Sequence, residues 1–158
     1  MIVVVDTNFV FSGILSPRGT ISDLLLNSSN TFDFYSPTSL SDELEEHHQK
    51  LSALSGLSDI ELNFLKRTIM NKINLIDLES IPLTSWGEAS ELTKNVDEFD
   101  IPFIALSLAL GAPLLTGDKK LKKGLEEKGV NWIFTFKILM PYFDFLVVLS
   151  NFNSWQYF

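Results

Sequence analysis

Four acidic residues that are far apart in this sequence stand at positions where an α/β fold would gather them. Asp6 directly follows the apolar run 2–5, and Asp118 comes just after a second apolar segment, 112–116. In open α/β sheets, functional groups collect beyond the carboxyl ends of the strands. If these two strands are neighbours in the sheet, Asp6 and Asp118 come within reach of one metal ion.

Asp100 and Glu43 are predicted to reach the same edge of the sheet. Asp100 begins an apolar segment that ends at Gly111. A helix of about ten residues spans some 15 Å, and the strand that follows returns over a comparable length. In the segment 40–54, Glu43 lies about 60° from the stripe of leucines, nearer to it than the other glutamates of that segment. Glu43 is therefore the acid at the edge of the core.

The chemistry of such a cluster favours a divalent cation. Four carboxylates without neutralising lysines repel one another strongly, and a bound cation relieves that repulsion. Ligands that are all oxygen suit Mg²⁺ or Mn²⁺ better than zinc. With two such ions, carboxylates can activate a water and stabilise an in-line displacement at phosphorus.

Each acid also has an ordinary structural interpretation. Asp100 and Asp118 both precede a predicted helix, where Asp is a favoured N-cap. Asp6 could hold a turn through its side chain, and Glu43 could be a solvated acid on a helix surface. Only the combination of all four favours a functional site.

The basic side chains offer a weaker signal. Lysines follow Asp118 at positions 119, 120, 122 and 123. They form either a solvated helix face or a contact for the phosphate backbone of a nucleic acid, with Lys119 and Lys120 nearest the acids. His47 is expected at the edge of the core, and His48 is expected on the surface.

Composition limits the class of protein. The chain has 158 residues, a net charge of −8 and no cysteine. This length fits one domain, and the negative charge means that any contact with nucleic acid must be arranged locally. The lack of cysteine excludes disulfides and thiolate sites and favours a cytoplasmic location. The start of the chain does not read as a signal peptide, and the apolar stretch 138–152 is too short to span a membrane, so no membrane partner is expected.

The elements that must position the acids alternate between strands and helices. The apolar patterns predict strands at 2–5, 32–35, 73–78, 112–116 and 132–136. They predict helices at 19–27, 40–54, 58–71, 85–95, 101–110 and 118–129, with a final helix within 137–158. Capping boxes at 58–61 and 85–88 mark two of the helix starts. This order predicts an α/β fold, a three-layer α/β/α sandwich around a mostly parallel sheet of about five strands.

These residues resemble the PIN-domain ribonucleases, which include the VapC-type toxins. The resemblance rests on VVVDTN at 3–8, SLSDEL at 39–44, DIPFIA at 100–105 and LLTGD at 114–118. It covers residues 1–136, taken as a PIN-like nuclease domain, and leaves 137–158 as an apolar tail or helix of the same domain. It implies an acidic pocket that binds Mg²⁺ or Mn²⁺ and cleaves RNA.

The resemblance assigns roles residue by residue. The catalytic and metal-binding positions are Asp6, Glu43, Asp100 and Asp118. The supporting positions are Asn8 beside the first Asp, Thr116 before the last, and Asp97 as a further acid near the pocket. Lys119 and Lys120 are candidates for contact with the substrate.

The expected function is therefore a metal-dependent endoribonuclease, with the toxin of a toxin–antitoxin pair as a candidate role. That role implies a protein antitoxin and a homodimer as partners. The insert 37–71 and the aromatic tail after Lys137 depart from compact toxins and weaken this role, but they leave the metal site untouched. A non-catalytic PIN-fold module that binds RNA or protein stays open as the alternative. A haloacid-dehalogenase-type phosphatase is disfavoured, because it needs a second Asp where Asn8 stands.

Overall fold

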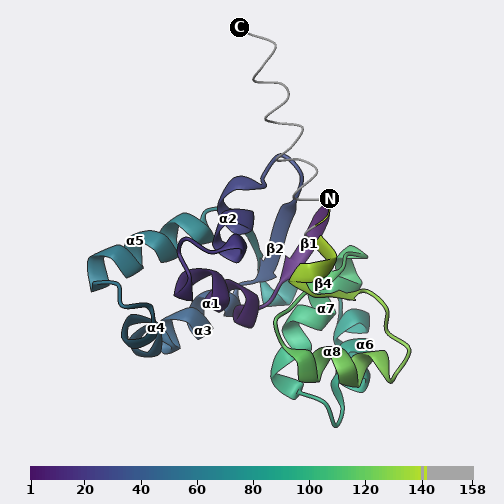
Figure 1. Cartoon of the computed structure of the whole chain (residues 1–158). Coiled ribbons are helices and arrows are strands. Elements are labelled where there is room, and N and C mark those ends of the chain that lie inside the picture. The colour runs from purple at the N-terminus through teal and green to yellow at the C-terminus, as the bar shows by residue number, and fades with distance from the viewer. Residues whose placement is uncertain (140, 142–158) are drawn as a thin grey trace, which may run out of the picture.

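A single parallel sheet forms the centre of the computed structural model, which describes residues 1–139 and 141. Its strands run in the order β3-β2-β1-β4-β5, and every neighbouring pair is parallel. Figure 1 shows β1 between β2 and β4. The strands are β1 (Ile2–Val5), β2 (Asp33–Pro37), β3 (Ile73–Ile76), β4 (Leu114–Leu115) and β5 (Ile133–Phe134). The predicted α/β fold with a mostly parallel sheet of about five strands is confirmed.

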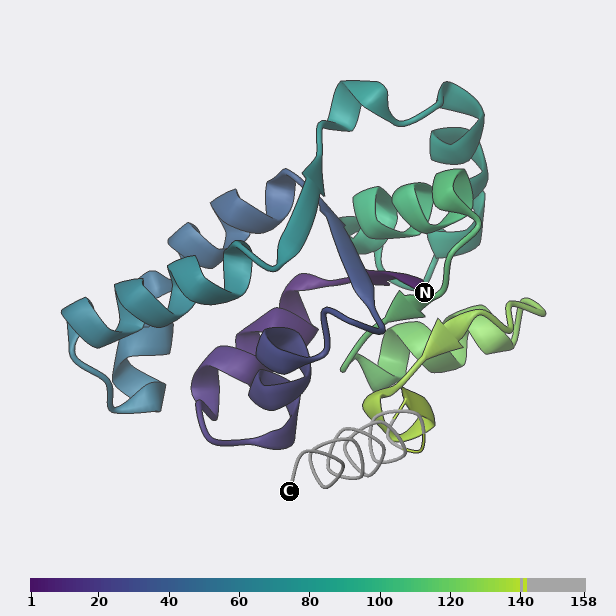
Figure 2. The same ribbon diagram turned by 90° about the horizontal axis from the view of Figure 1, so that it is seen from above.

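Helices cover both faces of this sheet. They are α1 (Thr7–Leu15), α2 (Thr20–Asn27), α3 (Ser39–Glu46), α4 (His48–Ser55), α5 (Asp59–Met70), α6 (Leu83–Thr93), α7 (Ile101–Leu110) and α8 (Lys119–Glu126). Two short 3₁₀ helices, η1 (Leu78–Ser80) and η2 (Glu98–Asp100), lie in the connections. Helices α1 to α5 lie on one side of the central strands and α6 to α8 on the other (Figures 1 and 2). The arrangement is the expected three-layer sandwich.

Strand β1 anchors the core and fixes the edge at which the acids meet. Val3, Val4 and Val5 have no exposed surface, as expected for a β-branched strand covered on both faces. Val5 pairs with Leu115, and these are the last residues of β1 and β4. The residues that follow the two strands therefore emerge side by side.

Helix α1 was not predicted. Its sequence, TNFVFSGIL, contains β-branched residues and a glycine, which have weak helix propensity. Helix α1 packs closely against α2 at this glycine, where a Cβ on Gly13 would lie only 2.9 Å from the end of the Leu25 side chain. The glycine lets the two helices approach closely, and this contact stabilises a helix that the sequence pattern does not show.

Several predicted boundaries were also wrong. The single helix expected at 40–54 ends at His47 and restarts as α4. The Ser58 capping box is present, but Ser85 lies inside α6, whose N-cap is Pro82. Strand β5 ends at Phe134, two residues earlier than expected.

Most of the C-terminal region lies outside the described residues. Apart from residues 137–139 and 141, the predicted tail or helix at 137–158 lies outside the described residues. Within the described ranges, every helix is too short or too polar to span a lipid bilayer.

Candidate metal centre

Asp6 lies at the base of the site, directly after β1. Its side chain is 1% exposed, and its Oδ1 accepts a hydrogen bond from the Phe9 amide at 2.7 Å, which caps α1. Its Oδ2 is buried without a hydrogen-bond partner among the described residues. Burial raises the pKa of Asp6 to about 7, although the nearby Thr116 hydroxyl and the Phe9 amide lower it. One oxygen of Asp6 is thus structural, and the other is left for a ligand.

Asp100 ends η2 and stands at the start of α7, but its side chain does not cap that helix within the described part of the chain. Asp100 therefore occupies the N-cap position that its sequence suggests, but its side chain makes no capping hydrogen bond there among the described residues. Asp100 is 9% exposed. Burial first, and then the negative charges of Asp6, Asp97, Asp118 and Glu43, together raise its pKa to about 7. An ionised Asp100 needs a cation nearby.

Asp118 caps α8 in the way that its sequence position suggests. Its Oδ1 accepts hydrogen bonds from the amides of Lys120 at 2.7 Å and Leu121 at 3.0 Å. The Asp118 amide in turn donates to the Thr116 hydroxyl at 2.9 Å. Thr116 therefore positions Asp118, a supporting role of the kind expected for it. Both cap bonds use the same oxygen, so capping and metal binding are compatible.

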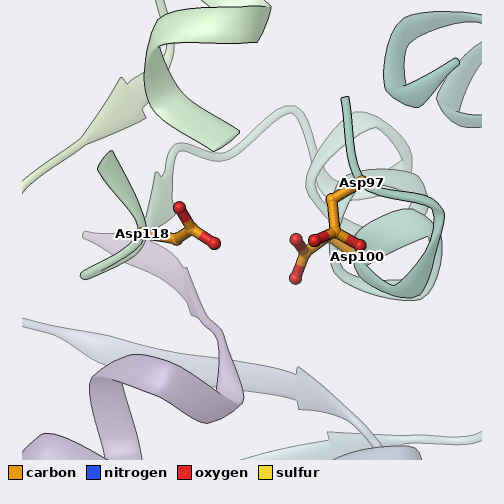
Figure 3. A group of neighbouring side chains, drawn as sticks. All are labelled: Asp97, Asp100 and Asp118. Carbon is orange, nitrogen blue, oxygen red and sulfur yellow. The ribbon is translucent and has the colours of Figure 1, made fainter. Parts of the chain in front are cut away.

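Three carboxylates meet at this point. Asp97, Asp100 and Asp118 each offer an oxygen, and the three oxygens lie within 4.8 Å of one another. Figure 3 shows the Asp118 carboxylate facing those of Asp97 and Asp100 from the opposite side of the site. Asp97 also accepts a hydrogen bond from the Phe99 amide at 3.0 Å, which fixes its Oδ1. Asp97 was expected only to support the site, but its carboxylate belongs to the cluster of three.

Glu43 approaches from α3, on the other side of the sheet. The Thr7 hydroxyl donates a hydrogen bond to Glu43 Oε2. Burial raises the pKa of Glu43, while this hydrogen bond and the nearby His47 lower it. Glu43 lies outside the tight cluster of three, but its charge raises the pKa values of both Asp6 and Asp100. The structure thus places all four predicted acids around one centre, at different distances.

Four of the acids open into a cleft of about 190 Å³, whereas Asp6 is buried and does not line it. Its lining residues are Thr7, Asn8, Phe11, Glu43, His47, Lys50, Asp97, Phe99, Asp100 and Asp118. Asn8 lines the cleft and is exposed, whereas the hydrogen bond from α1 to Glu43 comes from its neighbour Thr7. Sequence analysis missed Thr7 as a site residue, because its role depends on the unpredicted α1.

The basic side chains differ from their expected positions. His47 is exposed and lines the cleft, and His48 is the more buried of the two, with Nδ1 3.2 Å from Lys66 Nζ. Lys50 also lines the cleft, and no sequence pattern had indicated it as a site residue. Lys119 and Lys120 are exposed but do not line the cleft. Lys120 lines a neighbouring groove of about 400 Å³, together with Lys94, Lys123 and Lys128.

The donor set fits a divalent cation. All of the candidate ligands are carboxylate oxygens, which suit Mg²⁺ or Mn²⁺. The buried Oδ2 of Asp6 lacks a partner in the described chain, and a buried polar atom of this kind is normally satisfied. The raised pKa values of Asp6 and Asp100 show that ionising these acids is unfavourable without a compensating positive charge.

Comparisons with known proteins agree with this geometry. A family model described as "PIN domain" matches residues 4–134. The crystal structure of VapBC2 from Rickettsia felis bound to a DNA fragment from their promoter contains a chain of similar fold. It matches with a TM-score of 0.61 and 17% identity, over 85% of this chain and 97% of that one. Comparison with curated proteins gave no significant match. The match over residues 4–134 extends across most of the sequence, and this chain therefore belongs to the PIN-domain family.

Proposed function

We propose that this protein is a metal-dependent endoribonuclease that hydrolyses RNA phosphodiester bonds. The observation that carries the proposal is the meeting of Asp97, Asp100 and Asp118 within 4.8 Å, next to the buried and half-satisfied Asp6. Membership of a family whose members are generally nucleases supports the same conclusion. Helix capping alone does not explain the acid at position 100, because the Asp100 side chain makes no capping hydrogen bond within the described structure.

The carboxylates have distinct proposed roles. Asp6, Asp100 and Asp118 would hold Mg²⁺ or Mn²⁺, Asp97 belongs to the same cluster of oxygens, and Glu43 lines the cleft beside it. The bound cation supplies charge neutralisation at the phosphate and lowers the pKa of a water. Glu43 has a raised pKa and a fixed hydrogen bond from Thr7, so it can accept a proton from the attacking water. Lys50 provides positive charge at the cleft for the phosphate backbone, and His47 lines the cleft beside it.

A toxin role, with a protein antitoxin as partner, is the finer form of this proposal. It is supported by the similarity in fold to a chain of the VapBC2 complex. A surface suited to a protein partner exists on α5, where Ile60 and Phe64 are 84% and 71% exposed and lie one helical turn apart. A homodimer and a cytoplasmic location belong to the same proposal.

The test is cleavage of a mixed RNA pool with Mn²⁺ or Mg²⁺. We expect the wild type to cut, and Asp6→Asn or Asp118→Asn to lower the rate by about 10²-fold or more, because each removes a charged ligand. Asparagine can still cap a helix, so both variants should fold. Asp33→Asn is the matched control, since Asp33 is exposed and lies at the amino end of β2.

Calorimetry with Mn²⁺ completes this experiment. If the wild type binds Mn²⁺ but does not cleave RNA, and both site variants lose the binding, the metal centre would be supported and the assigned activity would be overturned. An absence of metal binding in the wild type would overturn both, and would favour a non-catalytic binding module.

A further inference from the structure

An aromatic side chain at the mouth of the cleft has no structural explanation in the fold. Phe99 is 91% exposed, more than any other large apolar side chain among the described residues. It lies in η2, between Asp97 and Asp100, and lines the cleft. A single exposed apolar side chain is not unusual in itself, but Phe99 lies beside a polar cleft, where a flat ring of a ligand could stack on it.

The backbone that carries Phe99 is held in place by the acid cluster itself. The Phe99 amide donates to Asp97 Oδ1 at 3.0 Å, and Asp97 is the N-cap of η2. The next residue, Asp100, is 9% exposed and leads into the buried helix α7. The ring is therefore attached to a fixed turn between two carboxylates, although the ring itself faces solvent.

The other wall of the cleft carries positive charge over a second aromatic ring. Lys50 Nζ lies 5.6 Å from the centre of the Phe11 ring, and the His47 ring packs edge-on against the same ring at 6.1 Å. Phe11 is on α1 and Lys50 is on α4, so this wall belongs to the opposite layer of the sandwich from Phe99. The cleft thus has carboxylates along it, the Phe99 ring on one side and the Lys50 cation on the other.

We propose that Phe99 stacks on an RNA base at the mouth of the cleft, while Lys50 contacts a neighbouring backbone phosphate. This inference rests on the proposed ribonuclease function and names residues that bind its substrate. An acidic protein with an acidic centre repels phosphates, so affinity must come from local cations and from contacts that carry no charge. Stacking on an aromatic ring is such a contact, and it requires a base that is not already stacked inside a duplex.

Binding can be measured in the Asp6→Asn background, where the RNA should stay intact. The probe is a fluorescently labelled single-stranded RNA of twelve nucleotides, compared with its duplex, with anisotropy in Mg²⁺ as the readout. We expect Phe99→Leu to weaken binding of the single strand about 5- to 150-fold, and Phe99→Trp to restore it. Lys50→Gln should weaken binding less and reduce its dependence on salt.

Two controls separate stacking from a structural effect. Leu83→Ala removes another highly exposed apolar side chain, 87% exposed on α6 and outside the cleft lining, and should leave binding unchanged. The indole emission of Phe99→Trp should be quenched when RNA is added, beyond any change in the protein with Phe99. A merely structural role for the ring would not produce this quenching.

The possible outcomes distinguish this inference from the proposed function. Equal binding by Phe99→Leu and its parent, or equal affinity for single strand and duplex, would overturn the stacking role even if the wild type cleaves RNA. Binding that depends on Phe99, in a protein that never cleaves RNA, would support the stacking role and overturn the nuclease. The Mn²⁺ affinity of Phe99→Leu, measured by calorimetry, should match that of the wild type. Leucine keeps the backbone amide that donates a hydrogen bond to Asp97.

Discussion

Asp6 shows how one side chain can serve the fold and the site together. Its Oδ1 caps α1, and its Oδ2 is buried without a partner in the described chain. The capping bond stabilises the folded state, whereas burial of the second oxygen makes ionisation unfavourable. The raised pKa of about 7 is the net result. A function is the simplest reason for a fold to keep a carboxylate in this position.

Replacing Asp6 with asparagine should therefore stabilise the metal-free protein in a pH-dependent way. Folded Asp6 keeps its proton up to about pH 7, whereas the unfolded chain loses it near 3.8, so its ionisation reduces stability as pH rises between these values. Asparagine keeps the cap and cannot ionise. We expect Asp6→Asn to be equal to the wild type near pH 4 and more stable by about 1–3 kcal/mol at pH 8.

Urea unfolding in the presence of a chelator measures this difference across the pH range. Asp33→Asn, at an exposed site on the opposite edge of the sheet, should give a flat difference over the same range. An Asp6→Asn variant that is less stable than the wild type at pH 8 would show that the carboxylate is stabilising in the apoprotein, contrary to its raised pKa.

The acids of the site could be predicted from sequence, whereas the residues around them could not. Asp6, Asp100 and Asp118 follow from the ends of strands and the starts of helices, which apolar patterns reveal. Their assignment as metal ligands stays a prediction. Lys50 and Phe99 depend on how α4 and η2 are oriented in space, and no local pattern encodes that orientation.

At the scale of elements, α8 touches the connection that delivers Asp97. Gly124 of α8 lies so close to Val96 that an added Cβ would be 2.6 Å from Val96 Cγ1. Val96 directly precedes Asp97 in the sequence. The spacing between α8 and this connection therefore positions two of the clustered acids, because Asp118 is the N-cap of the same helix. We therefore expect a larger residue at position 124 to disturb the site as well as the local packing.

Gly124→Ala should consequently destabilise the protein and weaken metal binding. Alanine improves helix propensity by about 1 kcal/mol, but overpacking costs about 1–3 kcal/mol, so we expect a net loss of up to about 2 kcal/mol. Gly87→Ala is the matched control, since Gly87 lies in α6 with open space around its missing Cβ, and it should be neutral or stabilising. Thermal unfolding and Mn²⁺ calorimetry measure the two effects.

A second substitution tests the cause. Val96→Ala shortens the side chain that the new methyl group would meet, so the double variant should recover Mn²⁺ affinity relative to Gly124→Ala alone. If the single and double variants bind Mn²⁺ equally weakly, the proximity of α8 to Val96 does not govern the position of Asp97.

The strands were easier to predict than the helices, for a physical reason. Strands of a buried parallel sheet are short apolar runs such as 2–5, and this signal lies within the element itself. Helix α1 packs against α2 at Gly13. This contact involves a second segment of the chain, so the sequence of α1 alone does not reveal it. The break at His47 and the start of α6 after Pro82 also differ from the predicted helix bounds.

For the whole molecule, the net charge of −8 destabilises the compact state through repulsion between like charges, and the clustered acids add to this repulsion. A divalent cation at the centre would relieve part of this repulsion and bind the folded state alone. Metal binding should therefore appear as a gain in global stability, not only as a local event. This gain can be measured without any assumption about the RNA.

We expect Mn²⁺ at about 100 times its Kd to stabilise the wild type by about 2.7 kcal/mol, which raises Tm by about 5–10 °C for a chain of this size. The rise should grow as the pH increases through about 7, because Asp6 and Asp100 must lose their protons to bind the cation. Asp118→Asn should abolish most of the rise while keeping the α8 cap, whereas Asp33→Asn should keep the full rise. Differential scanning calorimetry with and without Mn²⁺ at pH 5.5 and 8 provides the measurement. An equal rise in all three proteins, or a larger one at pH 5.5, would place the cation away from this cluster.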